Sequence, residues 1–175
     1  MNAPRPPGRT PVLIVGAGMV GLTVAVELGQ RGVPCTIVCD QPDTAAHPQG
    51  NTLNSRTMEH FRRLGLAEAI RATGLPADHS MDIVYATRFA GWELARLAMP
   101  TTAEKTQHRP TNEHAALTPE PIHRCSFFLV EPILKRSLET MPSVTLAFGW
   151  RLNGFEQDAD GVTATLEQVE SGETT

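Results

Sequence analysis

"VLIVGAGMVGLTVAVELGQRGVPCTIVCD", residues 12–40, decides the fold of this chain. It opens with a short, continuous apolar run, which is typical of a strand buried on both faces of a parallel sheet. The spacing then predicts a helix over 19–31, a left-handed cap at Gly32 and a second strand over 33–39. Strand, helix and strand joined by short links form a right-handed βαβ unit. Three aliphatic residues of the helix, four apart, are expected to face the sheet: Val20, Val24 and Leu28.

The bulk composition favours a folded domain and narrows its partners. The chain has 175 residues, of which 41% are hydrophobic and 19% charged, the balance of a globular protein with a core of its own. Its net charge is −4 and its 15 Lys and Arg are scattered, which argues against nucleic acid or an anionic membrane as a partner. No apolar run approaches the roughly 18 residues of a spanning helix.

The termini and the cysteines add three expectations. Residues 1–10 are rich in proline and arginine, lack the apolar core of a signal peptide and are expected to form a flexible tail. The three cysteines and six histidines show no metal-ligand spacing, so no metal site is expected. The cysteines are expected to be buried, reduced thiols rather than disulfides or metal ligands, which favours a cytoplasmic location.

Beyond residue 40 the pattern predicts a mixture of short helices and hairpins. Asn54 is expected to cap a helix that Gly65 ends. Residues 100–124 contain four prolines and no periodicity, so a long loop is expected there. The remaining expected elements are a helix over 55–64, a short helix over 66–72, a hairpin of 81–88 with 92–98, a helix over 130–140 with Pro132 in its first turn, a strand over 144–148, and a hairpin of 152–157 with 162–168.

The turn after the first strand reads Gly16-Ala17-Gly18-Met19-Val20-Gly21. In this motif Gly16 permits the tight turn, Gly18 lets the backbone approach a diphosphate, and Gly21 lets the helix pack closely on the strand. The start of the helix offers free N–H groups and a positive dipole end to the phosphates. Asp40 follows at about the distance expected of an acid that binds a ribose, and it would repel a 2′-phosphate. The motif therefore favours FAD or NAD over NADP, and does not separate the first two.

A second stretch resembles a known family. "HPQGNTLNSRTMEHFRRLGLAEAI", residues 47–70, is similar to the FAD-binding domain of the class A flavoprotein aromatic hydroxylases, a group that includes phenol, hydroxyphenylpropionate and polyketide hydroxylases. The resemblance rests on an LN-x-RTME-x-x-R-x-LGL run, here residues 53–66. It continues through the "EPIL" of residues 131–134 and through "GFEQDADGVTATL", residues 154–166.

The resemblance implies a fold and a set of domains. The expected fold is α/β, a Rossmann-like FAD-binding domain of the glutathione-reductase type, with a parallel sheet, a βαβ unit, an antiparallel hairpin and an incomplete substrate domain. Residues 11–75 and 126–175 would form the discontinuous FAD-binding domain. Residues 76–125 would contribute a hairpin and a long loop to the substrate side.

The resemblance also implies an activity. NADH or NADPH would reduce FAD, and reaction with O2 would place a hydroxyl group on a phenolic or polyketide aromatic ring. Arg56 would bind the FAD diphosphate, as a guanidinium beside the glycine loop can do. No catalytic residue is assigned. The cofactor-binding residues expected are Gly16, Gly18, Gly21, Asp40 and Arg56.

This sequence departs from the family pattern in three respects. Cys39 stands where the family usually has its ribose-binding acid, and Asp40 comes one residue later. Phe127 stands where the family commonly has a glutamine near the flavin. Two later motifs of the family, which contact the flavin and NAD(P)H, are not found. Residues 1–175 are therefore expected not to hydroxylate a substrate alone, and a second copy or a complementing chain is an expected partner.

Two alternatives stay open at this point. An NAD-dependent dehydrogenase has a similar glycine turn and predicts nicotinamide binding without flavin colour. A non-catalytic, truncated binding or assembly module predicts no retained flavin and exposed apolar surface where strands are missing.

Overall fold

The computed structural model describes residues 4–107 and 118–175. The chain divides into two compact units, one of Met1–Gly50 with Ser126–Thr175 and one of Asn51–Cys125. The stretch 100–124, for which a loop was predicted, lies partly outside the described residues, which omit 108–117. The division into an FAD-binding domain and a substrate-side region stays a prediction.

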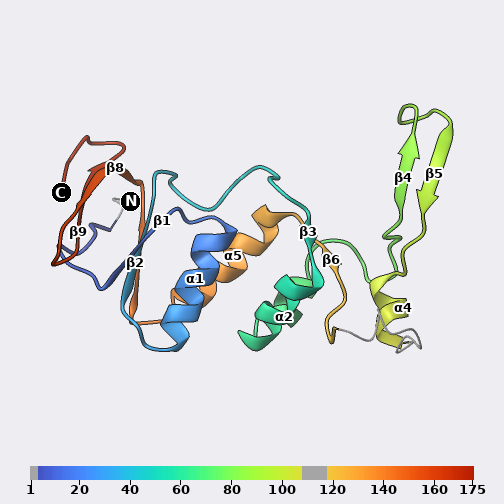
Figure 1. The fold of residues 1–175 in the computed structure, drawn as a ribbon, viewed down its shortest axis with the longest axis horizontal. Helices are drawn as coiled ribbons and strands as arrows, with labels where there is room; N and C mark the ends of the chain where they lie inside the picture. The colour runs from blue at the N-terminus through green and yellow to red at the C-terminus, as the bar shows by residue number, and fades with distance from the viewer. Residues whose placement is uncertain (1–3, 108–117) are drawn as a thin grey trace. The chain divides into compact units, whose positions relative to one another are not determined.

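The first unit is built on a parallel sheet of three strands in the order β1-β2-β7. Figure 1 labels β1 and β2 of this sheet, with α1 and α5 beside them. Val12 of β1 pairs with Cys35 of β2, which pairs in turn with Val144 of β7. The α/β fold with its βαβ unit and parallel sheet is thereby confirmed. The elements of this unit are β1 (Val12–Val15), α1 (Met19–Gln30), β2 (Cys35–Cys39), α5 (Phe127–Leu138), β7 (Val144–Phe148), β8 (Trp150–Gln157) and β9 (Val162–Gln168).

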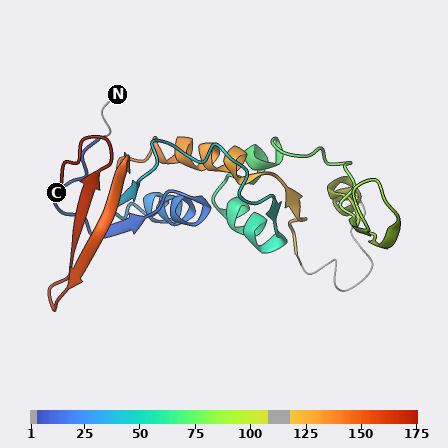
Figure 2. The same cartoon turned by 90° about the horizontal axis from the view of Figure 1, so that it is seen from above.

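The sheet is covered on both faces. Helices α1 and α5 lie side by side on one face, and the β8–β9 hairpin lies on the other (Figure 2). Strand β2 is buried over Cys35–Val38, because each of its faces packs against one of these layers. The core under the hairpin consists of Val38, Ala147, Trp150 and Leu166.

Helix α1 presents a different face to the sheet from the one expected. Its buried residues are Leu22, Ala25 and Val26, whereas Val20 and Val24 are 79% and 42% exposed. The prediction that Val20, Val24 and Leu28 face the sheet was therefore wrong for the two valines. The physical reason is close packing: the helix approaches its neighbours through small residues four apart, Gly21, Ala25 and Gly29.

The other helix and the hairpin of this unit occur close to where the sequence placed them. Helix α5 begins at Phe127, three residues before the predicted start, so Pro132 lies in the helix interior rather than in its first turn. The β8–β9 hairpin is confirmed. Its turn is held by the carboxylate of Asp158, which accepts hydrogen bonds from the N–H groups of Asp160 and Gly161 at 2.8 and 2.9 Å.

The second unit contains short elements. The side chain of Asn54 accepts a hydrogen bond from the Thr57 N–H at 2.8 Å, which confirms the predicted helix cap. Strands β3 and β6 fall in predicted loops, because a pairing of two residues is too short to leave an alternating pattern. The elements are β3 (Thr52–Leu53), α2 (Ser55–Arg63), α3 (Ala67–Arg71), β4 (Ile83–Ala86), β5 (Glu93–Leu97), α4 (Thr102–Gln107) and β6 (His123–Arg124).

The predicted β4–β5 hairpin is confirmed and is exposed along its whole length. Phe89, Trp92 and Leu94 are 109%, 83% and 69% exposed. An isolated hairpin of two strands is marginally stable in water. Exposed apolar side chains on this scale are typical of protein–protein, membrane or ligand-binding surfaces. Within the described residues, no helix combines the length and apolarity needed to cross a bilayer.

Candidate functional site

The glycine loop joins β1 to α1, and two of its three glycines are required by the fold itself. Gly16 has φ +101°, a backbone conformation that side chains disfavour, and its N–H donates to the Val38 carbonyl of β2 at 2.8 Å. A Cβ on Gly21 would lie 1.9 Å from the Gly16 carbonyl oxygen and 3.3 Å from Cγ2 of Ile14. Gly16 thus serves the turn and Gly21 serves the packing of helix on strand.

Gly18 is different, because nothing in the protein requires it. Its φ of −81° and ψ of −174° are extended values that any residue adopts. A Cβ there would meet only Oε1 of Glu131, at an ordinary contact distance of 3.8 Å. The position is open space beside the start of α1. A side chain would therefore fit at Gly18, and its absence leaves room for a ligand to approach the backbone closely.

The start of α1 is suited to hold an anion. Gly18 is the N-cap, no side chain caps the helix, and its first turn contains no acidic residue. The first intrahelical bond is donated by the N–H of Leu22 to the Gly18 carbonyl at 2.9 Å, so the earlier N–H groups have no acceptor within the helix. Those N–H groups and the positive end of the helix dipole together favour a phosphate.

Asp40 follows β2 directly and lies at the same sheet edge as the glycine loop. Its carboxylate accepts a hydrogen bond from Nε2 of Gln41 at 3.1 Å and lies 3.7 Å from Nε of Arg151. The Asp40 and Arg151 side chains are 43% and 52% exposed. An exposed ion pair of this kind is worth at most about 1 kcal/mol. A ribose that bound to Asp40, as predicted, would have to displace this weak ion pair and the hydrogen bond from Gln41.

Arg56 belongs to the second unit, whereas the other four predicted residues belong to the first. It lies in the first turn of α2, its side chain is 76% exposed, and it pairs with Glu59 at 3.0 Å. The pKa of Glu59 is lowered, mainly by a hydrogen bond from Thr118 and next by one from Arg56. Arg56 borders a hollow of about 650 Å³ lined also by Glu59, His60, Arg62, Arg63 and Pro119. Its basic lining suits an anionic group.

Sequence reasoning missed Glu131. This residue of α5 is 2% exposed, and its Oε2 accepts a hydrogen bond from the Ala45 N–H at 3.0 Å. Its Oε1 is the atom that a Cβ on Gly18 would meet. The "EPIL" motif contained the signal, since an acid in an otherwise apolar helical stretch needs a buried partner.

His123 is buried and has a structural role. Its Nε2 lies 3.0 Å from the Thr73 carbonyl and 3.2 Å from the Ile70 carbonyl. Since carbonyl oxygens only accept, Nε2 carries the proton and donates to the end of α3. The pKa of His123 is lowered, mainly by burial, which favours the neutral form of the ring.

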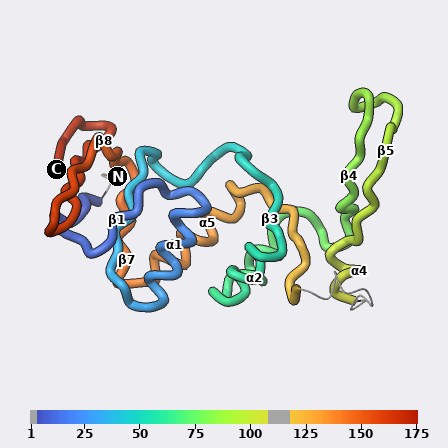
Figure 3. Tube along the Cα trace, viewed as in Figure 1, coloured from blue at the N-terminus to red at the C-terminus, as the bar shows by residue number. Residues whose placement is uncertain are grey.

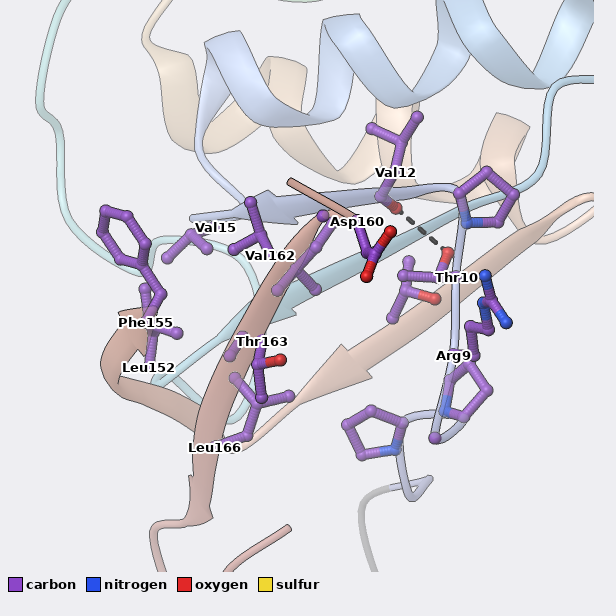
Figure 4. Close-up of a pocket in the computed structure, with 18 residues that line it drawn as sticks. Arg9, Thr10, Val12, Val15, Leu152, Phe155, Asp160, Val162, Thr163 and Leu166 are labelled. Carbon is purple, nitrogen blue, oxygen red and sulfur yellow. Dashed lines mark hydrogen bonds between the residues drawn. The ribbon is translucent and has the colours of Figure 1, made fainter. Parts of the chain in front are cut away.

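A cavity of about 1300 Å³ lies between β1 and the β8–β9 hairpin, as Figure 4 shows. Its walls include Val12 and Val15 of β1, Phe155 of β8 and Val162 of β9, and the segment before β1 closes one side. None of the five predicted cofactor-binding residues lines it. In 4–107 and 118–175, no three His, Cys, Asp or Glu side chains gather to hold a metal ion.

Comparison with known proteins identifies the family of this chain. The model of the FAD binding domain family matches residues 9–175. The chain belongs to this family. FAD is the family's cofactor, so the dehydrogenase alternative is overturned, and the resemblance that residues 47–70 indicated is confirmed.

Relatives of the FAD-binding domain include monooxygenases. Tetracenomycin B2 monooxygenase-dioxygenase of Streptomyces olivaceus is 33% identical over 169 residues, which cover 89% of this chain and 30% of the relative. The 2,4-dichlorophenol 6-monooxygenase of Delftia acidovorans is 33% identical over 159 residues, or 90% of this chain and 26% of the relative. The chain thus spans about 30% or less of these relatives.

Solved structures show the same fold. The flavin-dependent monooxygenase PieE, in complex with FAD and substrate, is 34% identical with a TM-score of 0.82, and the match covers 95% of this chain and 28% of PieE. RebC with bound 7-carboxy-K252c is 37% identical with a TM-score of 0.79, over 94% of this chain and 30% of RebC. The Rossmann-like FAD-binding fold expected from the sequence is confirmed.

Proposed function

We propose that this chain binds FAD and forms the cofactor-binding portion of an NADH- or NADPH-dependent monooxygenase acting on phenolic or polyketide aromatic substrates. The observation that carries the proposal is Gly18, whose missing side chain serves a close ligand and nothing in the protein. FAD, when bound, would supply the redox chemistry that links the reductant, O2 and the aromatic ring.

The chain's own residues hold the nucleotide half of FAD. The N–H groups at the start of α1 donate to the diphosphate beside Gly18, while Gly16 and Gly21 fix the loop. Asp40 accepts from the ribose hydroxyls, and Arg56 pairs with a diphosphate oxygen. The role of Arg56 is supported by the exposure of its side chain and by the basic hollow that it borders.

In this proposal the oxygenase activity requires more polypeptide than residues 1–175. The matched relatives are more than three times as long as the stretch compared. Residues 1–175 then bind flavin without hydroxylating a substrate, and a further polypeptide segment or a second copy completes the substrate side. The three free cysteines, with the pKa of the Cys35 and Cys125 thiols raised mainly by burial, support a reducing, cytoplasmic setting.

Titration of residues 1–175 with ADP and with FAD tests the proposal. ADP carries the diphosphate and ribose without the flavin ring, so both ligands are expected to raise the melting temperature and FAD to give a yellow protein after gel filtration. NADPH-driven oxygen uptake is expected to stay at background with an added phenol. A chain that responds to neither nucleotide would instead be the non-catalytic module, which the exposed Phe89 and Trp92 favour.

A further inference from the structure

The buried carboxylate of Glu131 lies between two segments of the proposed site. Glu131 is 2% exposed, and burying a carboxyl group is costly unless it is hydrogen-bonded. Its Oε2 accepts from the Ala45 N–H at 3.0 Å, while its Oε1 lies 3.8 Å from the place of a Cβ on Gly18. One side chain of α5 thus reaches both the loop that follows β2 and the loop that precedes α1.

The chain trace over residues 43–50, here called the strap, passes beside α5 (Figure 2 and Figure 3). Three residues of α5 at intervals of four, Phe127, Glu131 and Lys135, contact successive points of the strap. The Phe127 N–H donates to the Gly50 carbonyl at 2.9 Å, and a Cβ on Gly50 would lie 2.6 Å from the Phe127 ring. Nζ of Lys135 donates to Oδ1 of Asp43 at 2.7 Å. The strap therefore runs along one stripe of the helix, with Glu131 at its middle.

The middle contact differs from the two that flank it. Lys135 and Asp43 are 24% and 61% exposed, which makes their bond a surface ion pair of small energy. The Glu131 contact is buried and is the member of the stripe that also reaches the glycine loop.

We infer that Glu131 is a positioning residue for the nucleotide site: the reach of its side chain sets the spacing between the strap and the glycine loop, and FAD affinity depends on that spacing. The inference rests on the proposed FAD site. It assigns to the "EPIL" glutamate a role through Ala45 and Gly18 rather than direct contact with the cofactor. A preformed spacing lowers the cost of ordering the loops when the ligand binds.

Three substitutions separate reach from charge. Glu131→Gln keeps the length and an oxygen acceptor for the Ala45 N–H but removes the charge. Glu131→Asp keeps the charge but withdraws the carboxylate by about 1.5 Å. Glu131→Ala removes both. Glu139→Ala is the matched control, because Glu139 is an exposed acid at the end of the same helix.

The measurements are the ADP dissociation constant by calorimetry, the melting temperature without ligand, and hydrogen exchange of the Ala45 amide, which reports the contact itself. We expect Glu131→Gln and Glu139→Ala to bind ADP within about threefold of the unmodified chain, and Glu131→Asp and Glu131→Ala to bind about tenfold more weakly or worse. Exchange at Ala45 is expected to accelerate only in the last two.

Several results would overturn the inference. Wild-type affinity in Glu131→Asp would show that reach is irrelevant, and a Gln variant as weak as the Ala variant would show that charge is what matters. Should Glu131→Ala fail to fold, the Asp and Gln pair still decides. An unmodified chain that binds neither ADP nor FAD removes the proposed function and this inference with it. Normal binding that no Glu131 variant alters removes the inference alone.

Discussion

Replacing Gly18 by alanine separates the needs of the ligand from the needs of the fold. The backbone at Gly18 is already extended, and the added Cβ would meet one atom at 3.8 Å. The loss of a good N-cap residue and the gain from a stiffer unfolded chain nearly cancel, so the free energy of unfolding should change by less than about 1 kcal/mol. For a chain of this length that is about 2–4 °C in melting temperature.

In the proposed site the same methyl group would lie where the diphosphate approaches. Displacing the diphosphate from the first N–H groups of α1 would remove one or two charge-assisted hydrogen bonds, about 3 kcal/mol, or roughly 100-fold in affinity. At an ADP concentration 100 times the dissociation constant, the unmodified chain gains about 2.7 kcal/mol of stability. A variant with 100-fold weaker binding would gain only about 0.4 kcal/mol under the same conditions.

Thermal melts with and without ADP measure both quantities, and Gly21→Ala provides the contrast. Its Cβ would lie 1.9 Å from the Gly16 oxygen, so the backbone must move. We expect that variant to lose about 3 kcal/mol or more without any ligand. If Gly18→Ala keeps the full ADP-induced shift, the space at Gly18 is not a phosphate site and the argument for the FAD site fails.

Three further substitutions test other parts of the chain. Arg56→Ala should leave the ligand-free melting temperature within about 2 °C, because the side chain is 76% exposed, yet weaken ADP binding about tenfold by calorimetry; equal affinity would remove Arg56 from the site. Asn54→Ala should cost about 1 kcal/mol in urea unfolding through loss of the helix cap, and an unchanged free energy of unfolding would show that the cap contributes nothing. Burial lowers the pKa of His123, so the unfolded chain binds the proton more readily and stability should fall as pH drops through the ordinary histidine range. His123→Gln, which keeps an N–H donor, should flatten that pH dependence in melts; an unchanged slope would assign it to other groups.

The parallel core could be predicted because its signals are local. An apolar run, a glycine turn and a β-branched run fix β1, α1 and β2 without reference to the rest of the chain. The face of α1 could not be predicted, since it depends on how closely Gly21 and Gly29 approach other segments. Apolar spacing alone favoured Val20 and Val24, which are exposed.

The residues of the candidate site also divide into those that local sequence could predict and one that it could not. Gly16, Gly18, Gly21 and Asp40 could be predicted as cofactor-binding residues because the motif encodes their roles in spacing along one stretch, and these roles stay predictions. Glu131 was not found, because its partners Ala45 and Gly18 are 86 and 113 residues away in the chain. Outside the site, helix α4 was not predicted because none of its residues is buried, so its sequence has no apolar periodicity.

The three glycines of the loop show what the motif says about function. A chain that kept only the ancestral fold would still need Gly16 for its positive φ and Gly21 for its contact with the Gly16 oxygen, because losing either would disturb the βαβ unit. It would not need Gly18, where a methyl group fits. A glycine retained at that one position, beside a helix start without a cap and a buried carboxylate from α5, is what continued nucleotide binding predicts. The departures at Cys39 and Phe127 bear on the strength of FAD binding. The first leaves Asp40 at the sheet edge, where its partners Gln41 and Arg151 are exposed, and the second packs its ring on the strap.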